Sequence, residues 1–296
     1  FVIEEFLEAV KKALEERNID IPFVIVRSDG SLMNGEFTAA RPVETLLCGP
    51  VASVMGAAEL TSEENCIVVD IGGTTTDIAF VKNGVPQRVK NGVRIGKWDT
   101  FVKGLFVDTF GLGGDSGVII DRDANVKLEE EKVMPLCMAA DMHPSLLKLL
   151  KREYDSRSRL YSQQKNIYLK IKNIEKDSGY TQKECEIAEL LSEPHSLEEL
   201  KSLYGETVMD YHLQRLIREG ILIRCGVTPT DVMHVKGDFV KYNMEAARYG
   251  IEILARVMKV TLEEMSEMIY EAFKKKLYSN IVRILIEDAY PKIRET

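Results

Sequence analysis

The stretch IVVDIGGTTTDIAFV, residues 67–81, places a polar loop between two apolar runs. The first run stops at Asp70, and the second begins at Ile78. Two glycines, three threonines and a second acid, Asp77, lie between them. Short apolar runs bounded by turn residues are typical of buried strands. The stretch therefore predicts two strands joined by a polar loop.

The residues of this loop have the chemistry that a phosphate group requires. Glycine has no Cβ, so the backbone N–H groups at Gly72 and Gly73 can come close to phosphate oxygens. Hydroxyl donors are added by Thr74, Thr75 and Thr76. A Gly-Gly turn alone is weak evidence, but the frame of threonines, acids and apolar strands makes the prediction of a phosphate loop much more specific.

Two carboxylates frame the loop. Asp70 stands at the end of the first strand, where it is a candidate Mg²⁺ ligand, usually through water. Asp77 closes the loop, where it can bond to the backbone or help to position a water. Phosphoryl transfer needs mainly such positioning and charge neutralisation. The alternative is a hairpin loop that binds nothing. The sequence contains neither a P-loop pattern nor a Rossmann fingerprint.

The neighbouring residues predict further local elements. Asn83–Gly84 supplies the positive φ angles of a type I′ turn, which indicates an antiparallel meander with the phosphate loop at its first bend. Residues 48–60 predict a helix with Pro50 in its first turn, where proline is tolerated. Residues 1–17 predict an amphipathic helix because apolar residues recur four apart.

The composition changes near residue 130, where glycine nearly vanishes and charged helix formers dominate. Residues 180–226 predict three helices and a short strand, an order that resembles a winged-helix module. Capping boxes are predicted at Ser196 with Glu199 and at Thr261 with Glu264. The predicted organisation is an α/β lobe over 1–130, a mainly helical insertion over 131–225, and a helical return to the lobe over 226–296.

The overall composition limits the class of protein. A net charge of −8 argues against a nucleic-acid surface for the whole chain. No apolar run approaches the roughly 20 residues needed to cross a bilayer. The five cysteines have no C-x-x-C spacing, which indicates reduced thiols and a cytoplasmic location rather than a zinc site or a disulfide framework.

Four ordered blocks resemble the hydantoinase/oxoprolinase family of the hydantoinase A type, within the actin-like ATPase superfamily. The blocks are Arg27–Gly30 with the Pro42–Thr45 and Cys48–Pro50 segments, Asp70–Asp77, FGLGGDSGVIID at 110–121, and TPTDVMHVKGD at 228–238. The resemblance covers about residues 20–121 and 226–258.

The resemblance implies an actin-like ATPase lobe with a ribonuclease H-like fold. It implies an ATP-dependent amidohydrolase that uses ATP and Mg²⁺ to phosphorylate a cyclic amide or related carbonyl, so that water can open it. The same scaffold also serves carboxylases and other carbonyl-activating enzymes. Asp70 would organise Mg²⁺, and Gly72 to Thr76 would hold phosphate. A small-molecule substrate and a second subunit are the implied partners; a membrane or nucleic-acid partner is not expected.

The sequence also departs from the family pattern. The family's first Asp-x-Gly-Gly-Thr loop and its late Gly-Gly turn for adenosine are both missing from the chain. We therefore expect an internal fragment of a longer protein with little ATPase activity of its own. Cys48 replaces a serine of the pattern, and Asp115 replaces the third glycine of Gly-Gly-Gly-Ser.

Several candidate residues have a structural alternative. Gly113 and Gly114, with Asp115 and Ser116, form either a second anion or metal site or a tight turn. Asp231 is either a catalytic or metal-binding group, by resemblance, or a helix N-cap. His234 is either an acid/base group or ligand, or a hydrogen-bonded histidine beside a helix. Cys48 is either a reactive thiol or a small core residue, and Asp108 is a further acid that could join this group.

A second class of function competes with the enzyme. The chain is alternatively an ATP-dependent conformational switch or scaffold, whose winged-helix-like insertion binds a partner protein. A DNA-binding winged helix is disfavoured, because the candidate recognition helix carries two acids against two arginines.

Overall fold

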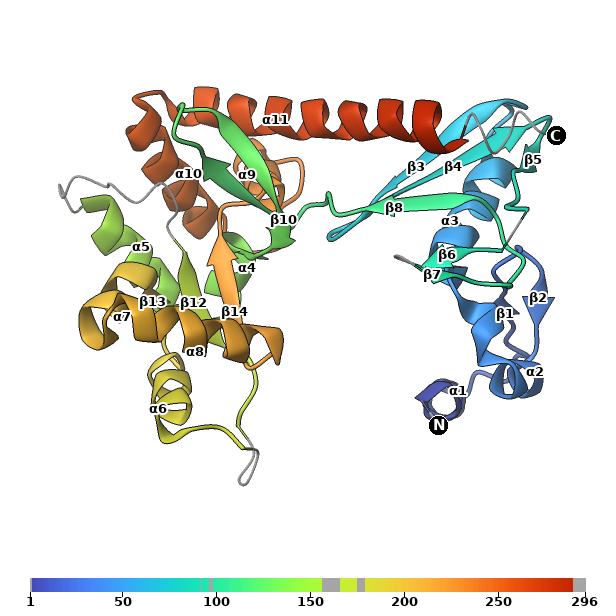
Figure 1. Ribbon diagram of the computed structural model, residues 1–296, viewed down its shortest axis with the longest axis horizontal. Coiled ribbons are helices and arrows are strands. Elements are labelled where there is room, and N and C mark those ends of the chain that lie inside the picture. The colour runs from blue at the N-terminus through green and yellow to red at the C-terminus, as the bar shows by residue number, and fades with distance from the viewer. Residues whose placement is uncertain (1, 91, 96–97, 156–165, 175–178, 290–296) are drawn as a thin grey trace. The chain divides into compact units, whose positions relative to one another are not determined.

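The computed structural model describes the chain except residues 1, 91, 96–97, 156–165, 175–178 and 290–296. The chain forms two compact units, shown in Figure 1. Unit 1 comprises residues 1–110 and 280–296, and unit 2 comprises residues 111–279. The predicted parts had limits at 130/131 and 225/226. The two units are divided at residues 110/111 and 279/280, and residues 111–130 belong to unit 2, where Gly114 and Val118 form backbone hydrogen bonds with Thr230 and Val227.

An antiparallel sheet forms the centre of unit 1. β3 (Cys66–Ile71), β4 (Thr76–Lys82) and β5 (Val85–Pro86) follow one another as a meander, and β8 (Val107–Phe110) pairs with β4 on its other side. Asn83 and Gly84 have φ angles of 53° and 73°, as a type I′ turn requires. The predicted meander and its turn are therefore confirmed.

The two faces of this sheet are both covered. α3 (Cys48–Leu60) packs Val51 and Val54 against Ala79 on one face. On the other face, Ile78 and its neighbours enclose Ile284, which begins the π-helical η2 (Ile284–Ala289). Each buried valine or isoleucine in these clusters contributes roughly 1.5–3 kcal/mol to stability.

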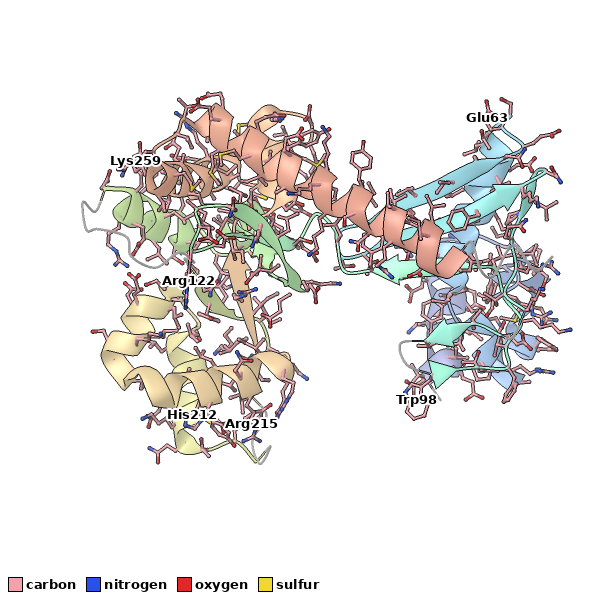
Figure 2. All side chains as sticks on the ribbon, turned by 45° about the horizontal axis from the view of Figure 1, so that its top comes forward. Glu63, Trp98, Arg122, His212, Arg215 and Lys259 are labelled. Carbon is pink, nitrogen blue, oxygen red and sulfur yellow. The ribbon has the colours of Figure 1, made fainter. Side chains whose placement is uncertain are left out.

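The remaining elements of unit 1 are short. They are α1 (Val2–Glu15), β1 (Ile25–Val26), β2 (Leu32–Met33), α2 (Gly35–Ala40), η1 (Pro42–Thr45), β6 (Arg94–Ile95) and β7 (Trp98–Asp99). The first helix agrees with the amphipathic helix predicted for residues 1–17. The Trp98 side chain, labelled in Figure 2, is 80% exposed on the β6–β7 hairpin.

Unit 2 contains a hairpin, a small mixed sheet and a set of helices. β9 (Ser116–Ile120) and β10 (Val126–Lys132) form the hairpin. The sheet has the order β11-β14-β12-β13, formed by Met134–Pro135, Leu222–Gly226, Ile167–Lys170 and His195–Ser196. The helices outside the segment 180–226 are α4 (Leu136–Met142), α5 (Ser145–Asp155), α9 (Pro229–Lys236), α10 (Met244–Met258) and α11 (Leu262–Arg283). The last of these begins at the predicted Thr261–Glu264 cap.

The segment 180–226 has the predicted order of helices and a final strand. α6 (Gln182–Leu190), α7 (Leu197–Tyr204) and α8 (Glu206–Arg218) pack around buried leucines and Ile187. The capping box at Ser196 and Glu199 is present. The strand after α8 pairs with β12, which precedes the three helices in the sequence. The interpretation as a winged-helix module stays a prediction.

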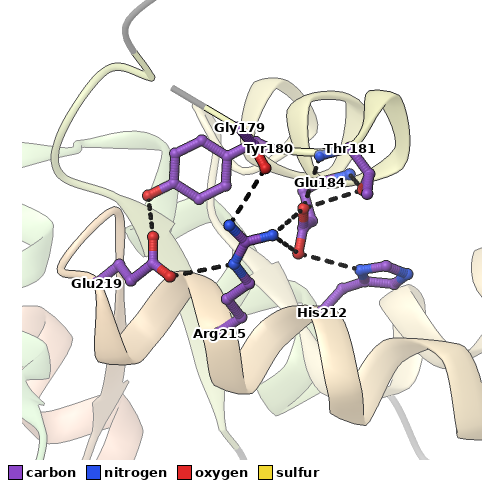
Figure 3. A network of polar contacts seen from close by, with 7 residues as sticks. All are labelled: Gly179, Tyr180, Thr181, Glu184, His212, Arg215 and Glu219. Atoms are coloured by element: carbon purple, nitrogen blue, oxygen red, sulfur yellow. Dashed lines mark hydrogen bonds and ion pairs between the residues drawn. The ribbon is translucent and has the colours of Figure 1, made fainter. Parts of the chain in front are cut away.

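A polar network fixes α6 to α8, as Figure 3 shows. Glu184 is fully buried at the start of α6 and pairs with Arg215 at 3.0 Å and with His212 at 3.4 Å. Burial alone would raise the pKa of the Glu184 carboxyl. The backbone N–H and hydroxyl of Thr181, together with these pairs, outweigh burial and hold the pKa below its ordinary value. The guanidinium of Arg215 also lies over the ring of Tyr180, with its Cζ atom 4.9 Å from the ring centroid.

No helix within the described parts of the chain is long and apolar enough to cross a membrane.

Candidate phosphate and metal site

The predicted phosphate loop is the tight connection between β3 and β4. The Gly72 N–H donates to the Thr75 carbonyl at 2.8 Å, which closes a turn of four residues. A Cβ on Gly72 would lie 3.2 Å from that carbonyl oxygen, closer than ordinary van der Waals contact. A Cβ on Gly73 would meet nothing within 4 Å. A side chain at position 72 would therefore crowd the Thr75 carbonyl, whereas Gly73 leaves its backbone open.

Asp70 and Asp77 lie opposite each other across this hairpin. They are direct partners in the antiparallel register of β3 and β4, so their side chains share one face of the sheet. Both residues are partly exposed. Two like charges at directly opposed positions destabilise a strand pair. A cation between them would remove that repulsion, so the geometry of the acids fits a hydrated Mg²⁺.

Thr109 extends this row of side chains to a third strand. The register of β4 against β8 pairs Asp77 with Thr109, and the Thr109 hydroxyl donates to Asp77 Oδ1 at 2.5 Å. The sequence analysis missed Thr109. Alternation along residues 107–110 could have placed it on the face opposite to Asp108, but the register of β8 is a long-range property.

The three predicted hydroxyl donors differ in position. Thr74 is exposed in the loop and Thr75 is partly exposed. Thr76 is fully buried and, by strand alternation, lies on the same face as Ile78. Asp108 is the register partner of Ile78, so it lies on that face as well, away from Asp77. Only some residues of the sequence motif therefore share the face of the sheet that carries Asp70 and Asp77. Thr76 lies on the opposite face.

The predicted second anion site in unit 2 is a closed turn. The Gly113 N–H donates to Ser116 Oγ at 3.0 Å. Thr230, at the start of α9, donates through its N–H and its hydroxyl to the Gly114 carbonyl at 3.0 and 2.8 Å. This turn thereby occupies a backbone donor of α9. These hydrogen bonds are those of a tight turn, the structural alternative for residues 113–116.

Asp115 is the member of this turn with an unpaired polar atom. Its Oδ1 atom is buried and has no hydrogen-bond partner in the structure. Burial raises the pKa of the Asp115 carboxyl, and the charge of Lys132 opposes that rise. A glycine at this position, as in the family pattern, would leave no carboxylate to bury.

Asp231 is fully buried and holds two helices at once. It is the third residue of α9, in a capping box whose N-cap is Thr228. Its Oδ2 atom accepts from the Thr228 N–H at 2.9 Å, and its Oδ1 atom accepts from the Cys137 N–H of α4 at 2.8 Å. Burial raises the pKa of the Asp231 carboxyl, and the hydrogen bonds from Cys137 and Thr228 oppose that rise. The observed contacts correspond to the capping alternative, with Thr228 rather than Asp231 as the N-cap.

His234 is also fully buried, and both its ring nitrogens have partners. Nδ1 lies 2.8 Å from the Thr230 carbonyl, and Nε2 accepts from the N–H groups of Lys241 and Tyr242 at 3.3 and 3.1 Å. These contacts correspond to the hydrogen-bonded alternative. Cys48, the first residue of α3, is partly buried.

The structure thus brings together Asp70, Asp77 and Thr109 in unit 1, and joins the Gly113–Ser116 turn to α9 in unit 2. Within the described residues, no three His, Cys, Asp or Glu side chains form a group that could hold a metal. Mg²⁺ commonly keeps several waters and binds through one or two carboxylates, which is the number the acid pair supplies.

Comparison with known proteins identifies a family for part of the chain. Residues 2–141 match the model of the hydantoinase/oxoprolinase family. The resemblance that the sequence motifs carry is confirmed over this range. The match includes the 70–77 hairpin and the Gly113–Ser116 turn, and it ends before Asp231.

Two acetone carboxylases are among the similar proteins. The beta subunit of acetone carboxylase from Xanthobacter autotrophicus is 25% identical over 118 residues, which are 39% of this chain and 16% of that subunit. A nucleotide-free acetone carboxylase structure aligns over 96% of this chain and 30% of its own, with a TM-score of 0.57 and 17% identity. This chain therefore has a related mixed α/β fold and spans less than a third of either relative.

Proposed function

We propose that this chain is the phosphate- and Mg²⁺-binding part of an ATP-dependent, carbonyl-activating enzyme of the hydantoinase/oxoprolinase type. The observation that carries the proposal is the pair Asp70 and Asp77, opposed across a hairpin whose bend is the Gly72–Thr75 turn. The pair is electrostatically unfavourable unless a cation is present, and the adjacent open backbone at Gly73 suits a phosphate. Unit 1 is accordingly proposed as an actin-like ATPase lobe.

The residues of the hairpin have distinct roles in this proposal. Asp70 and Asp77 hold a hydrated cation on one face of the sheet, and Asp77 also orients a water. The N–H groups and hydroxyls at Gly73 and Thr74 contact the phosphate from the bend. A bound Mg²⁺ would supply charge neutralisation during phosphoryl transfer. The protein's own contribution is to fix these groups before the nucleotide arrives.

The proposed substrate is a small molecule with an activatable carbonyl group. The similar structure concerns ATP-dependent acetone carboxylation, and the family name refers to cyclic amides. Both kinds of substrate contain a carbonyl group whose oxygen could accept a phosphoryl group. For a cyclic amide, the γ-phosphoryl group would pass from ATP to the amide oxygen, and water would then open the ring with release of phosphate. The relative named a beta subunit belongs to a multi-subunit enzyme, which supports a second subunit as a partner here.

Calorimetric titration with Mg²⁺-ATP tests the proposal directly. We expect the chain to bind Mg²⁺-ATP, and Asp70→Ala to weaken binding at least tenfold, because the cation loses a carboxylate ligand. Asp123→Ala, at an exposed acid of unit 2, is the matched control and should bind as the original chain does. Equal affinities in all three proteins would reject the hairpin as the site.

The switch or scaffold function is the second candidate. The observation that favours it is the exposure of large apolar side chains on the helices of 180–226, with Leu203 63% and Tyr211 72% exposed. A turnover assay separates the two functions. Turnover that requires a small cyclic amide or ketone supports the enzyme, whereas slow hydrolysis stimulated by a partner protein supports the switch.

A further inference from the structure

We propose that Thr109 is a positioning residue for the cation, because it fixes the Asp77 carboxylate. This inference rests on the proposed function of the 70–77 hairpin. It adds a residue from a third strand that no sequence motif identifies.

The geometry of the sheet supports a specific role for the hydroxyl. Asp70, Asp77 and Thr109 occupy successive positions in one row across β3, β4 and β8. The Thr109 Oγ1–H donates to Asp77 Oδ1 at 2.5 Å, which leaves Oδ2 available. Among the described residues, no group donates a hydrogen bond to the Asp70 carboxylate. The row therefore contains one carboxylate held by its neighbour and one that is free to turn toward a ligand.

The chemistry of threonine suits this role. Its β-branched side chain has few allowed χ1 rotamers, so the hydroxyl is held in place by the strand itself. Because the hydroxyl proton is donated to Asp77, the carboxylate keeps its orientation before a cation binds. Groups that hold a metal ligand in this way typically contribute 10- to 100-fold to metal affinity.

Two substitutions separate the hydroxyl from the rest of the side chain. Thr109→Val keeps the shape and the β-branch but removes the donor, whereas Thr109→Ser keeps the donor. Thr109 is exposed at the surface of unit 1, so neither variant creates a buried cavity. The two variants therefore test the hydrogen bond rather than the packing.

The experiment uses Mn²⁺ alone as the probe, with the carboxyl carbons of Asp70 and Asp77 followed by ¹³C NMR. Without Mn²⁺, we expect Thr109→Val to shift the Asp77 carboxyl signal and Thr109→Ser to leave it near its original position. On titration, Mn²⁺ should broaden both signals, with an affinity about tenfold weaker in Thr109→Val and within about twofold of the original in Thr109→Ser.

The outcomes distinguish the two proposals. Broadening of both signals with equal affinity in Thr109→Val and the original chain overturns the role of Thr109 and leaves the proposed site intact. Broadening of neither signal in the original chain overturns the cation site and the role of Thr109 together. A loss in Thr109→Val that serine does not rescue overturns the role of the hydroxyl, because packing would then explain the loss.

Discussion

The hairpin acids of unit 1 and the buried acid of unit 2 have similar sequence surroundings and opposite structural surroundings. Asp70 and Asp77 face each other on a partly exposed sheet face, and Thr109 is the hydrogen-bond donor to one of them. Asp231 is fully buried, and its two oxygens accept from backbone N–H groups of two helices. Asp77 and Asp231 each directly follow a threonine in the sequence, Thr76 and Thr230.

The difference shows how a functional acid can be told from a structural one. A carboxylate that accepts several backbone hydrogen bonds has little capacity left for a ligand and stabilises the fold instead. Two carboxylates that repel each other, with a single hydroxyl donor to one of them, destabilise the fold until a cation binds. The predictions below test this contrast from its largest expected effect to its smallest.

Removing the buried acid should have the largest effect on stability. Asp231→Ala leaves the N–H groups of Cys137 and Thr228 buried without an acceptor, and we expect unit 2 to lose about 3 kcal/mol of unfolding free energy. Urea unfolding followed by circular dichroism measures this loss. Asp238→Ala, at an exposed acid just after α9, is the control and should stay within about 0.5 kcal/mol of the original. A loss in Asp231→Ala as small as that of the control would show that Asp231 is not a structural acid.

Neutralising one hairpin acid should affect ligand binding more than folding. Asp77→Asn should weaken Mg²⁺ binding about tenfold, or roughly 1.4 kcal/mol, while urea unfolding without Mg²⁺ shows no loss of stability. Calorimetric titration with Mg²⁺ measures the affinity. Unchanged affinity together with a loss of stability would place Asp77 in the same structural class as Asp231.

Asp115 is a partly buried acid whose effect on stability should depend on pH. Burial raises its folded-state pKa above the ordinary 3.8, so its stabilising contribution is complete below that value and is lost as pH rises through the folded pKa. Asp115→Asn should therefore be more stable than the original at pH 7 by about 1 kcal/mol, because the buried negative charge is removed while the shape of the side chain is kept.

The pH profile of the Asp115 variant supplies its own control. The difference in urea midpoint between Asp115→Asn and the original chain should shrink toward pH 3.5, where Asp115 is protonated in both the folded and unfolded states. A difference that is constant with pH would show that the titration of Asp115 does not contribute.

The smallest expected effect is the repulsion within the hairpin itself. Without divalent cations, Asp70→Asn should stabilise unit 1 by about 0.5 kcal/mol, because directly opposed like charges are removed. Saturating Mg²⁺ should reverse this order, since the original chain binds Mg²⁺ more tightly and gains more stability from it. Thermal unfolding with Mg²⁺ and with a chelator makes the comparison, and an order that Mg²⁺ does not change would contradict the acid pair as a cation site.

The parts of the fold that were predicted correctly depend on local sequence. The meander from β3 to β5, the Asn83–Gly84 turn, the start of α3 at Cys48 and the Ser196 capping box all follow from residues within a few positions of one another. Such signals are readable because turn and cap geometries demand particular residues.

The features that were missed depend on pairing between distant segments. Thr109 joins the acid row only through the register of β8 against β4. The role of Asp231 depends on α4, which begins 95 positions earlier in the sequence. The Thr181 and Thr228 capping boxes were local signals that the sequence analysis could have found. The loop at residues 70–77 could thus be predicted from the sequence. The side chains that share one face of the sheet with Asp70 and Asp77 could not.

The discontinuity of unit 1 has a consequence for biosynthesis. The face of the sheet that carries Ile78, Phe80 and Phe106 is completed by Ile284, and residues 111–279 form unit 2 in between. During translation, the hairpin therefore emerges from the ribosome long before the residue that closes its core. Unit 2 can collapse first, whereas the nascent strands of unit 1 must keep an apolar face exposed until Ile284 has been synthesised. Substitutions that slow the folding of unit 2 should thus lower the yield of folded unit 1, even though they lie in neither its sheet nor its proposed site.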